Sequence, residues 1–195
     1  RVRIFIKDYQ AVFSEGSESM QFIDRYLTPL GSVTMASDGR SLTGLWFDGQ
    51  KYYADTLHGE YVEKETDVFR QTKNWLDIYF SGKVPGFIPP LVLSGSPFRM
   101  RVWEILKSIS FGKTVTYGGI SKILEKETGG RVSAQAVGGA VGHNPISIIV
   151  PCHRVIGADG SLTGYAGGID KKTELLRIEG VDISKLKNPQ KGTAL

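Results

Sequence analysis

The chain has 195 residues, and 41% of them are hydrophobic, which is enough to build a packed core and excludes a disordered protein. Its single cysteine, Cys152, excludes an internal disulfide and any metal site built from several thiolates. No apolar run is long enough to span a bilayer, and the first residues lack the apolar stretch of a signal peptide. We therefore expect a cytoplasmic or nucleoid-associated protein that does not enter a membrane.

The formal net charge of +4 is unevenly distributed along the chain. Residues 1–91 carry 10 Lys and Arg against 12 Asp and Glu, a balance of −2, whereas residues 92–195 carry 14 against 8, a balance of +6. A basic half predicts a polyanionic partner. On charge alone, ordinary surface charge for solubility explains the difference slightly better.

The first residues look separate from the rest of the chain. The polar connector "SEGSES" precedes Met20, so we interpret residues 1–19 as an N-terminal extension, native or not. The alternation of Val2, Ile4 and Ile6 also fits an additional strand.

Residues 20–90 have the pattern of a small α/β domain. The stretches "QFIDRYLT", "SVTMAS" and "SLTGLWFDG" alternate with turn signals and predict an antiparallel meander. Residues 65–82 change to helical spacing, and Gly82 ends the helix. The proline-rich "KVPGFIPPLVLSGSP" then predicts a connection to a second domain, residues 91–183.

The second half begins with three predicted helices. Ser96 and Pro97 signal the start of the first, the second runs from near Thr116 to Gly129–Gly130, and Ser133 caps the third. Successive helices joined by short connectors predict a helix-turn-helix layout.

The segments that follow predict a β-ribbon and a final helix. An extended pair is expected around the turn "ADG", with an apolar strand at residues 146–150 leading into Cys152. Asp170 is expected to cap the last helix, which Gly180 ends. Helices followed by a ribbon indicate a winged-helix-like fold, and residues 184–195 are expected to form a loose tail.

The third predicted helix has very few side chains. Its glycines each lower helix stability by roughly 1 kcal/mol, so the sequence gives up stability there. Tight packing against another helix explains this as well as a close approach to nucleic acid does. Because the helix lacks polar side chains that read the major groove, nucleic-acid contact of this kind would be dominated by shape and would fit the minor groove better.

Cys152 stands between Pro151 and the pair His153–Arg154. A lone cysteine is most often a small buried hydrophobic residue. Here the neighbouring His153 and Arg154 provide positive charge and a base, which favour a thiolate nucleophile. The loop "GSLTGYAGG" that follows can approach a flat ligand closely.

The motif "PCHRV" resembles the active-site signature of the O6-alkylguanine-DNA alkyltransferases, also called methylated-DNA–protein-cysteine methyltransferases. The resemblance runs from about Ser96 to Gly180 and includes "FRMRVWEIL", "GKTVTYGGI", "AQAVGGAVGHNP", "GYAGG" and "LLRIEG" in order. The first half resembles the family more weakly, through "TPLG" and "LTGLWFDGQ". The resemblance implies an α+β protein with a ribonuclease H-like N-terminal domain and a winged-helix-like DNA-binding domain.

The resemblance also implies a single-use repair reaction on double-stranded DNA. The family flips an alkylated guanine out of the duplex, and the thiolate takes the alkyl group from O6; O4 of thymine is a second candidate substrate. Carried onto this chain, Cys152 is the acceptor, His153 acts through water as the base, and Glu179 orients His153. Tyr117 donates a proton or hydrogen bond to the leaving guanine, and Asn144 is the hinge between the third helix and the active-site strand. The implied substrate-binding residues are Pro145, Val155, Tyr165, Ala166 and Gly167, and the implied DNA-binding residues are Ser133, Gln135, Ala136, Gly138 and Gly139.

Two positions depart from the family pattern. Gln135 stands where the family commonly has an arginine that enters the base stack, and Ala166 stands where some members have serine. The first puts the strength of base flipping in doubt, whereas a backbone N–H at Ala166 still serves O6. The cysteines that hold zinc in some members are absent, so we expect no metal and no cofactor. We also expect the protein to act on DNA as a monomer.

Glu179, Tyr117 and Asn144 each also fit an ordinary structural position. A protein that recognises alkylated bases without transfer is the main alternative function, although the related proteins of that kind lack the cysteine. A cysteine hydrolase leaves the glycine-rich helix without a role, and a winged-helix regulator does not account for "PCHR".

Overall fold

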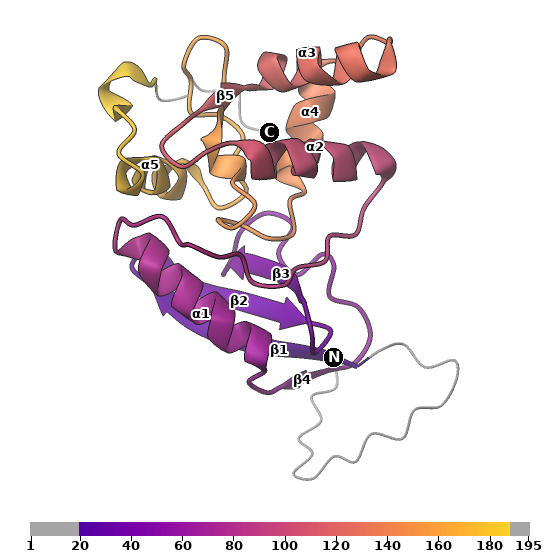
Figure 1. The fold of residues 1–195 in the computed structure, drawn as a ribbon, viewed down its shortest axis with the longest axis vertical. Helices are drawn as coiled ribbons and strands as arrows, with labels where there is room; N and C mark the ends of the chain where they lie inside the picture. Colours follow the sequence, from indigo (N-terminus) through magenta and orange to yellow (C-terminus); the bar gives the residue numbers. More distant parts are fainter. Residues whose placement is uncertain (1–19, 188–195) are drawn as a thin grey trace.

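The computed structural model describes residues 20–187. It has the expected α+β class, with a small sheet and one helix at one end and a helical half at the other (Figure 1). Residues 1–19, interpreted above as an extension, lie outside the described residues, as do residues 188–195 of the predicted tail. Within the described part, no helix is long and apolar enough to cross a membrane.

The sheet is the predicted meander with one strand added. β1 (Gln21–Thr28), β2 (Gly31–Ser37) and β3 (Leu42–Phe47) pair antiparallel. The sequence did not predict β4 (Tyr61–Glu63), which pairs parallel to β1 and gives the order β3-β2-β1-β4. The predicted helix is α1 (Asp67–Phe80), which lies across one face of the sheet (Figure 1).

One hydrophobic core runs through both halves of the molecule. Alternating residues of the strands, such as Val33 and Met35, are fully buried together with the apolar face of α1. The same cluster continues without a break into Val102, Ile120 and Val150 of the helical half. The active site described below can therefore draw residues from both halves.

The three helices of the second half form as their end signals predict. They are α2 (Pro97–Ser108), α3 (Tyr117–Thr128) and α4 (Ala134–Gly142). In each, the side chain of the N-cap residue (Ser96, Thr116 or Ser133) accepts a hydrogen bond from the backbone N–H of the third helical residue. Trp103 of α2 donates from Nε1 to the Ala140 carbonyl at 2.9 Å and fixes α4 against α2.

The strand predicted at residues 146–150 is wrong, because this segment is a buried turn. Only Ile146 bridges to a strand residue, Leu45. The amide of Asn144 donates to the carbonyls of Ile146 and Val150, and Ile148 takes a positive φ of 69°. These local hydrogen bonds bend the chain so that Cys152 begins a short 3₁₀ helix, η1 (Cys152–Arg154), instead of ending a strand.

The predicted ribbon is only partly correct. The turn at residues 157–161 is present, but β6 (Val155–Ile156) pairs parallel to β5 (Val115–Thr116) and not with the segment after the turn.

The C-terminal end also differs in detail from the predictions. α5 (Ile169–Ile178) has Gly168, not Asp170, at its N-cap, and Asp170 lies inside the first turn, where its charge suits the helix dipole. The start of the predicted loose tail is ordered, since η2 (Ile183–Lys185) precedes Lys187, which bridges to Ser161.

Candidate active site

The site is organised around the bend that Asn144 creates after α4. Its Nδ2 lies 2.8 Å from the Val150 carbonyl, 3.2 Å from the Ile146 carbonyl and 3.1 Å from Sγ of Cys152. Its Oδ1 accepts from the Ile146 N–H at 3.1 Å. The amide therefore joins the turn and the sulfur in one network, and the hinge role of Asn144 stays a prediction.

Cys152 is 4% exposed and is the only cysteine of the chain. Burial raises the pKa of its thiol, while the hydrogen bond from Asn144 and the nearby Lys172 act in the opposite direction. The two neighbours that were expected to provide positive charge or structural support, His153 and Arg154, both bind Glu179. Burial lowers the pKa of His153 and favours the neutral ring, and Arg154 is paired with Glu179. The resting sulfur is thus a protonated thiol that needs a base.

His153 and Glu179 form a fully buried pair. Nε2 of His153 lies 2.7 Å from Oε1 of Glu179, and because an ionised carboxylate only accepts, Nε2 carries the proton. Nδ1 of the ring is also buried and has no hydrogen-bond partner among the described residues. The neutral ring therefore offers an unshared acceptor.

The Glu179 carboxylate receives hydrogen bonds from four residues. Besides His153, Arg154 donates from Nε and Nη2 at 2.8 and 2.9 Å, the Tyr79 hydroxyl donates to Oε1 at 2.8 Å, and the Gly112 N–H donates to Oε2 at 3.0 Å. Burial alone would raise the pKa of Glu179, but the hydrogen bonds from His153 and Arg154 outweigh it and hold the pKa at about 2. Glu179 is therefore ionised at neutral pH.

Lys172 of α5 is a buried cation that the sequence reasoning missed. Its Nζ donates to the carbonyls of Val155 and Thr163 at 2.6 and 2.5 Å, so it joins the two chain segments on either side of the 157–161 turn. Burial lowers its pKa to about 8, and a thiolate at Cys152 would oppose that shift. Its positive charge lowers the pKa of the Cys152 thiol. The sequence analysis had expected this effect from His153 and Arg154.

Tyr117 stands at the start of α3 and is 8% exposed. Its hydroxyl donates to the Thr163 carbonyl at 2.9 Å, with the Gly164 carbonyl at 3.3 Å. Burial raises its pKa, so the group remains a proton donor at neutral pH. The hydroxyl thus borders the loop that carries Tyr165 and Ala166.

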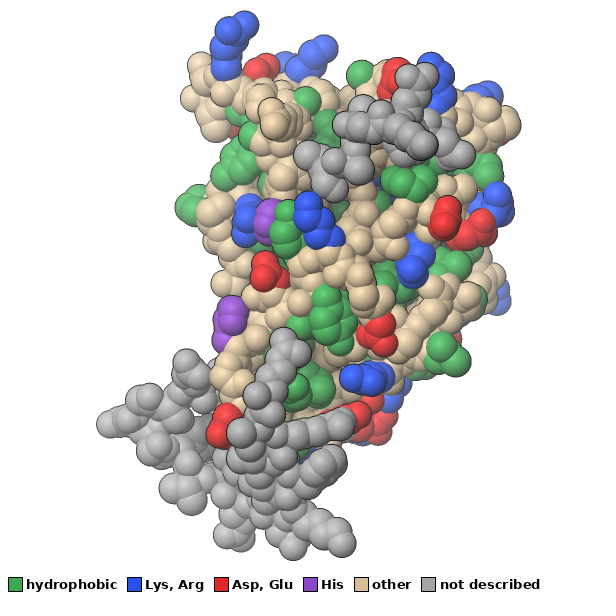
Figure 2. Space-filling model, turned by 180° about the vertical axis from the view of Figure 1, so that it is seen from behind, with side chains coloured by type: hydrophobic (Ala, Val, Ile, Leu, Met, Phe, Trp, Pro, Cys, Tyr) green, Lys and Arg blue, Asp and Glu red, His purple; other side chains and the backbone are tan. Residues whose placement is uncertain are grey.

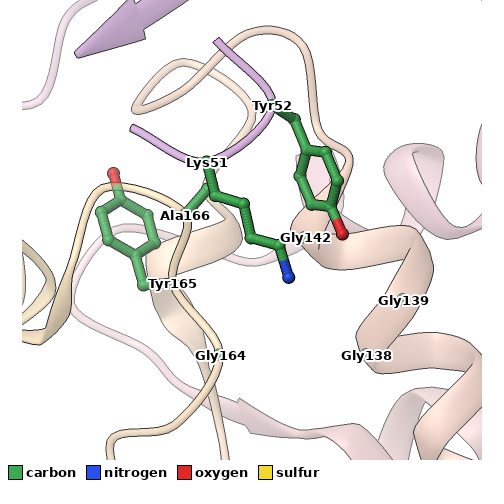
Figure 3. A pocket seen from close by; sticks show the side chains of 8 residues that line it. All are labelled: Lys51, Tyr52, Gly138, Gly139, Gly142, Gly164, Tyr165 and Ala166. Carbon is green, nitrogen blue, oxygen red and sulfur yellow. The ribbon is translucent and has the colours of Figure 1, made fainter. Parts of the chain in front are cut away.

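A pocket opens between that loop, α4 and the N-terminal half (Figure 3). Its volume of about 80 Å³ is well below the roughly 300–1,000 Å³ of most small-molecule sites, so a ligand of ordinary size needs the lining to move. Of the predicted residues it includes Gly138, Gly139, Tyr165 and Ala166; its other lining residues are Gly142, Gly164, Lys51 and Tyr52.

The sequence analysis did not predict that the N-terminal half lines this pocket. Lys51 and Tyr52 follow β3, and Figure 3 shows the Lys51 side chain between Tyr165 and the glycines of α4. The Lys51 N–H donates to the Ala166 carbonyl at 3.0 Å, and the Tyr52 ring stacks on His143 with centroids 3.9 Å apart. No local sequence signal marks these contacts, because they join distant parts of the chain.

The remaining predicted substrate-binding residues, Pro145, Val155 and Gly167, are not among those that line the pocket. Pro145 is buried and its carbonyl accepts from the Leu45 N–H at 2.9 Å, so it contacts β3 and does not line the pocket. Val155 is fully buried in β6. At Gly167 a Cβ would come within 2.8 Å of the Tyr165 ring, so glycine permits that ring position.

The predicted DNA-binding residues are grouped on the start and one face of α4. Ser133, Gln135, Ala136 and Gly139 are exposed, and Gly138 is buried. A Cβ at Gly139 would meet nothing within 4 Å, so packing inside this protein does not require glycine there. This favours close approach of an outside partner over tight helix packing. Figure 2 shows Lys and Arg side chains scattered over the face in view and interspersed with Asp and Glu, without a continuous basic patch.

Comparisons with known proteins agree with this arrangement. The family model "6-O-methylguanine DNA methyltransferase, DNA binding domain" matches residues 97–181, and that of the ribonuclease-like domain matches residues 24–91. The methylated-DNA–protein-cysteine methyltransferase of Mycobacterium tuberculosis is 43% identical over 78% of this chain and 88% of its own length, and that of Methanosarcina acetivorans is 42% identical over 78% and 94%.

The chain belongs to this methyltransferase family. Among solved structures, the crystal structure of Mycobacterium tuberculosis OGT in complex with DNA is similar with a TM-score of 0.70 and 39% identity, covering 86% of this chain and 94% of that one. The O6-methylguanine DNA methyltransferase of Methanococcus jannaschii is similar with a TM-score of 0.56 and 29% identity, covering 84% and 95%. The α+β fold expected from the resemblance is confirmed.

We expect the methyltransferase to lose stability in acid through Glu179. Its pKa of about 2 in the folded protein lies below the value of about 4.3 in an unfolded chain, so its contribution is present at neutral pH and is lost as the pH falls from about 5 to 2. The contribution is roughly 2–3 kcal/mol. Urea unfolding of the wild type at several pH values should show this loss, and Glu179→Gln should show a flatter dependence over that window.

Equal pH dependence in the two proteins would contradict this assignment. Should Glu179→Gln not fold, a carboxyl-carbon NMR titration of the wild type gives the same answer. A Glu179 midpoint at the unfolded value would then contradict it.

Proposed function

We propose that Cys152 accepts, once and irreversibly, the alkyl group from O6 of a guanine in double-stranded DNA, as the acceptor of a methylated-DNA–protein-cysteine methyltransferase. The observation that carries this assignment is the arrangement of three groups. Asn144 holds the buried thiol of Cys152, and the next residue, His153, is a neutral ring whose Nε2 is bound to Glu179 while its Nδ1 is free, among the described residues, to accept a proton. A nucleophile, a base and a group that orients the base are the parts that such a transfer needs.

The proton leaves Cys152 through His153. The ring nitrogen Nδ1 is buried without a protein partner among residues 20–187, and a water molecule between it and Sγ would pass the proton from sulfur to the ring. The imidazolium then formed is stabilised by Glu179, which is already ionised and keeps Nε2 protonated. The thiolate, whose charge Lys172 and Asn144 favour, is the attacking group.

The transfer step forms one bond and breaks one. The sulfur attacks the alkyl carbon, the bond from that carbon to O6 breaks, and its electron pair remains on the guanine. We assign to Tyr117 the donation of a proton to the departing base, once its hydroxyl turns from the Thr163 carbonyl. The proton that His153 took from Cys152 then passes through water and restores the tyrosine. The backbone N–H of Ala166 serves O6, and Tyr165 forms the wall of the pocket beside it.

The DNA contact that we propose is made through the minor groove by α4. Its exposed small residues, Ala136 and Gly139, allow close approach, and Ser133 and Gln135 provide polar contacts at its start. Gln135 would take the place of the flipped nucleotide. We propose that one monomer acts on each lesion, and the need for a free thiol fits the reducing cytoplasm.

Mass spectrometry tests the assignment of Cys152. After incubation with duplex DNA containing O6-methylguanine, the intact protein should gain one methyl group at most, and peptide mapping should place it on Cys152. Cys152→Ser should gain none while still binding the duplex. A wild type that binds the duplex tightly without gaining mass would indicate recognition without transfer.

Gly139→Ala tests the reason for the glycines of α4. Because the position is open, alanine should increase helix stability by up to about 1 kcal/mol, measured by urea unfolding. The added methyl should slow repair of duplex DNA more than transfer from free O6-benzylguanine. A variant with unchanged repair of both substrates would show that no partner approaches this position.

Gln135→Arg tests the departure at the start of α4. A longer cationic side chain should stabilise the extruded state and raise the repair rate on duplex DNA more than the rate with free O6-benzylguanine. Single-turnover rates with both substrates measure this. Equal changes in the two rates would count against a stacking role for this position.

A further inference from the structure

One polar group of the N-terminal half reaches His153 and Glu179, called here the catalytic pair. Tyr79 lies near the end of α1 and is fully buried. Its hydroxyl donates to Oε1 of Glu179 at 2.8 Å and lies 3.3 Å from Nε2 of His153. Tyr79 therefore binds the same carboxylate oxygen that accepts the hydrogen bond from Nε2 of His153.

Aromatic packing holds the Tyr79 ring in this position. The ring stacks on Trp75 of the same helix with centroids 5.3 Å apart, and Phe80 and Phe111 meet it edge-on at 5.4 and 5.9 Å. Since Trp75 is itself part of the core, the hydroxyl is delivered to Glu179 by packed and rigid surroundings.

The charges around the hydroxyl keep it a donor. Burial and the negative charge of Glu179 hold the pKa of Tyr79 far above its usual value, and Arg154 opposes this only in part. Tyr165 is the other titratable group that acts on Tyr79. The charge of Lys172 on α5 also lowers the pKa of His153.

We propose that Tyr79 is a positioning residue of the transfer reaction, supplied by the N-terminal half, which keeps His153 ready to accept the Cys152 proton. It occupies Oε1 together with Nε2 of His153, so it withdraws negative charge from the oxygen that would otherwise stabilise a protonated ring. It also fixes the orientation of the carboxylate. This inference rests on the proposed role of His153 as the base.

The pH profile of Tyr79→Phe tests the proposal. Phenylalanine keeps the ring packing and removes only the donor. Without the competing hydrogen bond, Oε1 of Glu179 stabilises protonated His153 more strongly. The acid limb of the methyl-transfer rate should therefore move upward by about 0.5–1 pH unit, which is a three- to tenfold lower rate at a given pH on that limb. Well above the limb, the rate should approach that of the wild type.

Tyr26→Phe is the matched control. It also removes a hydrogen bond from tyrosine to a carboxylate, that of Asp77 on α1, but it lies away from the catalytic pair. Its acid limb should stay where the wild type has it. A Tyr79→Phe limb that does not move, whether the rate is unchanged or lowered equally at every pH, would overturn the proposal.

An NMR titration of the His153 ring separates this proposal from the proposed function, because it needs no DNA. If the wild type transfers no methyl group, the function fails, and the titration alone decides the role of Tyr79. An upward shift of the His153 midpoint in Tyr79→Phe, and not in Tyr26→Phe, supports it. Identical titrations in all three proteins would overturn it.

Discussion

The Glu179 carboxylate is the constraint on which the arrangement of this protein depends. A buried charge is tolerated only when hydrogen-bond donors surround it, and here four residues donate to it. Tyr79 comes from α1, Gly112 from the turn before β5, and His153 and Arg154 from η1. Satisfying this one group therefore fixes the N-terminal half, the helical half and the nucleophile's own segment relative to one another.

The surroundings of the sulfur divide the chemistry between separate groups. Burial keeps the thiol protonated, and Asn144 and Lys172 favour the thiolate once a base takes the proton. Arg154, which stands closer in sequence, is paired with Glu179 instead. A protein that reacts once has no need of a thiolate at rest, and a protonated buried sulfur is also protected from adventitious oxidation.

Local signals in the sequence predict most of the elements correctly. Ser96, Ser133 and the glycine after α3 mark helix ends through contacts within one turn, so they can be identified without a fold. The strand at residues 146–150 is predicted wrongly because a buried turn and a buried strand have the same apolar composition. The hydrogen bonds of Asn144 decide between them.

The parts of the site that sequence reasoning misses all depend on long-range contacts. Tyr79 lies on the buried face of α1, but its hydroxyl donates to Glu179, which stands 100 positions later in the sequence. Lys51 and Tyr52 lie in a loop where two residues other than glycine, Tyr52 and Ala54, take a positive φ. The motif around Cys152 reveals the nucleophile and its base, and the fold supplies their partners.

The way the active-site turn meets the sheet has a consequence for aggregation. β3 is at the edge of the sheet, and Leu45 exchanges backbone hydrogen bonds with the turn, through the Pro145 carbonyl and the Ser147 N–H. Leu42 pairs in the same way with the connector, at Pro90 and Val92. The helical half thus covers an apolar strand edge that would otherwise recruit other chains. The N-terminal half expressed without the helical half would expose the edge of β3. Protection from aggregation and assembly of the active site therefore come from the same contacts.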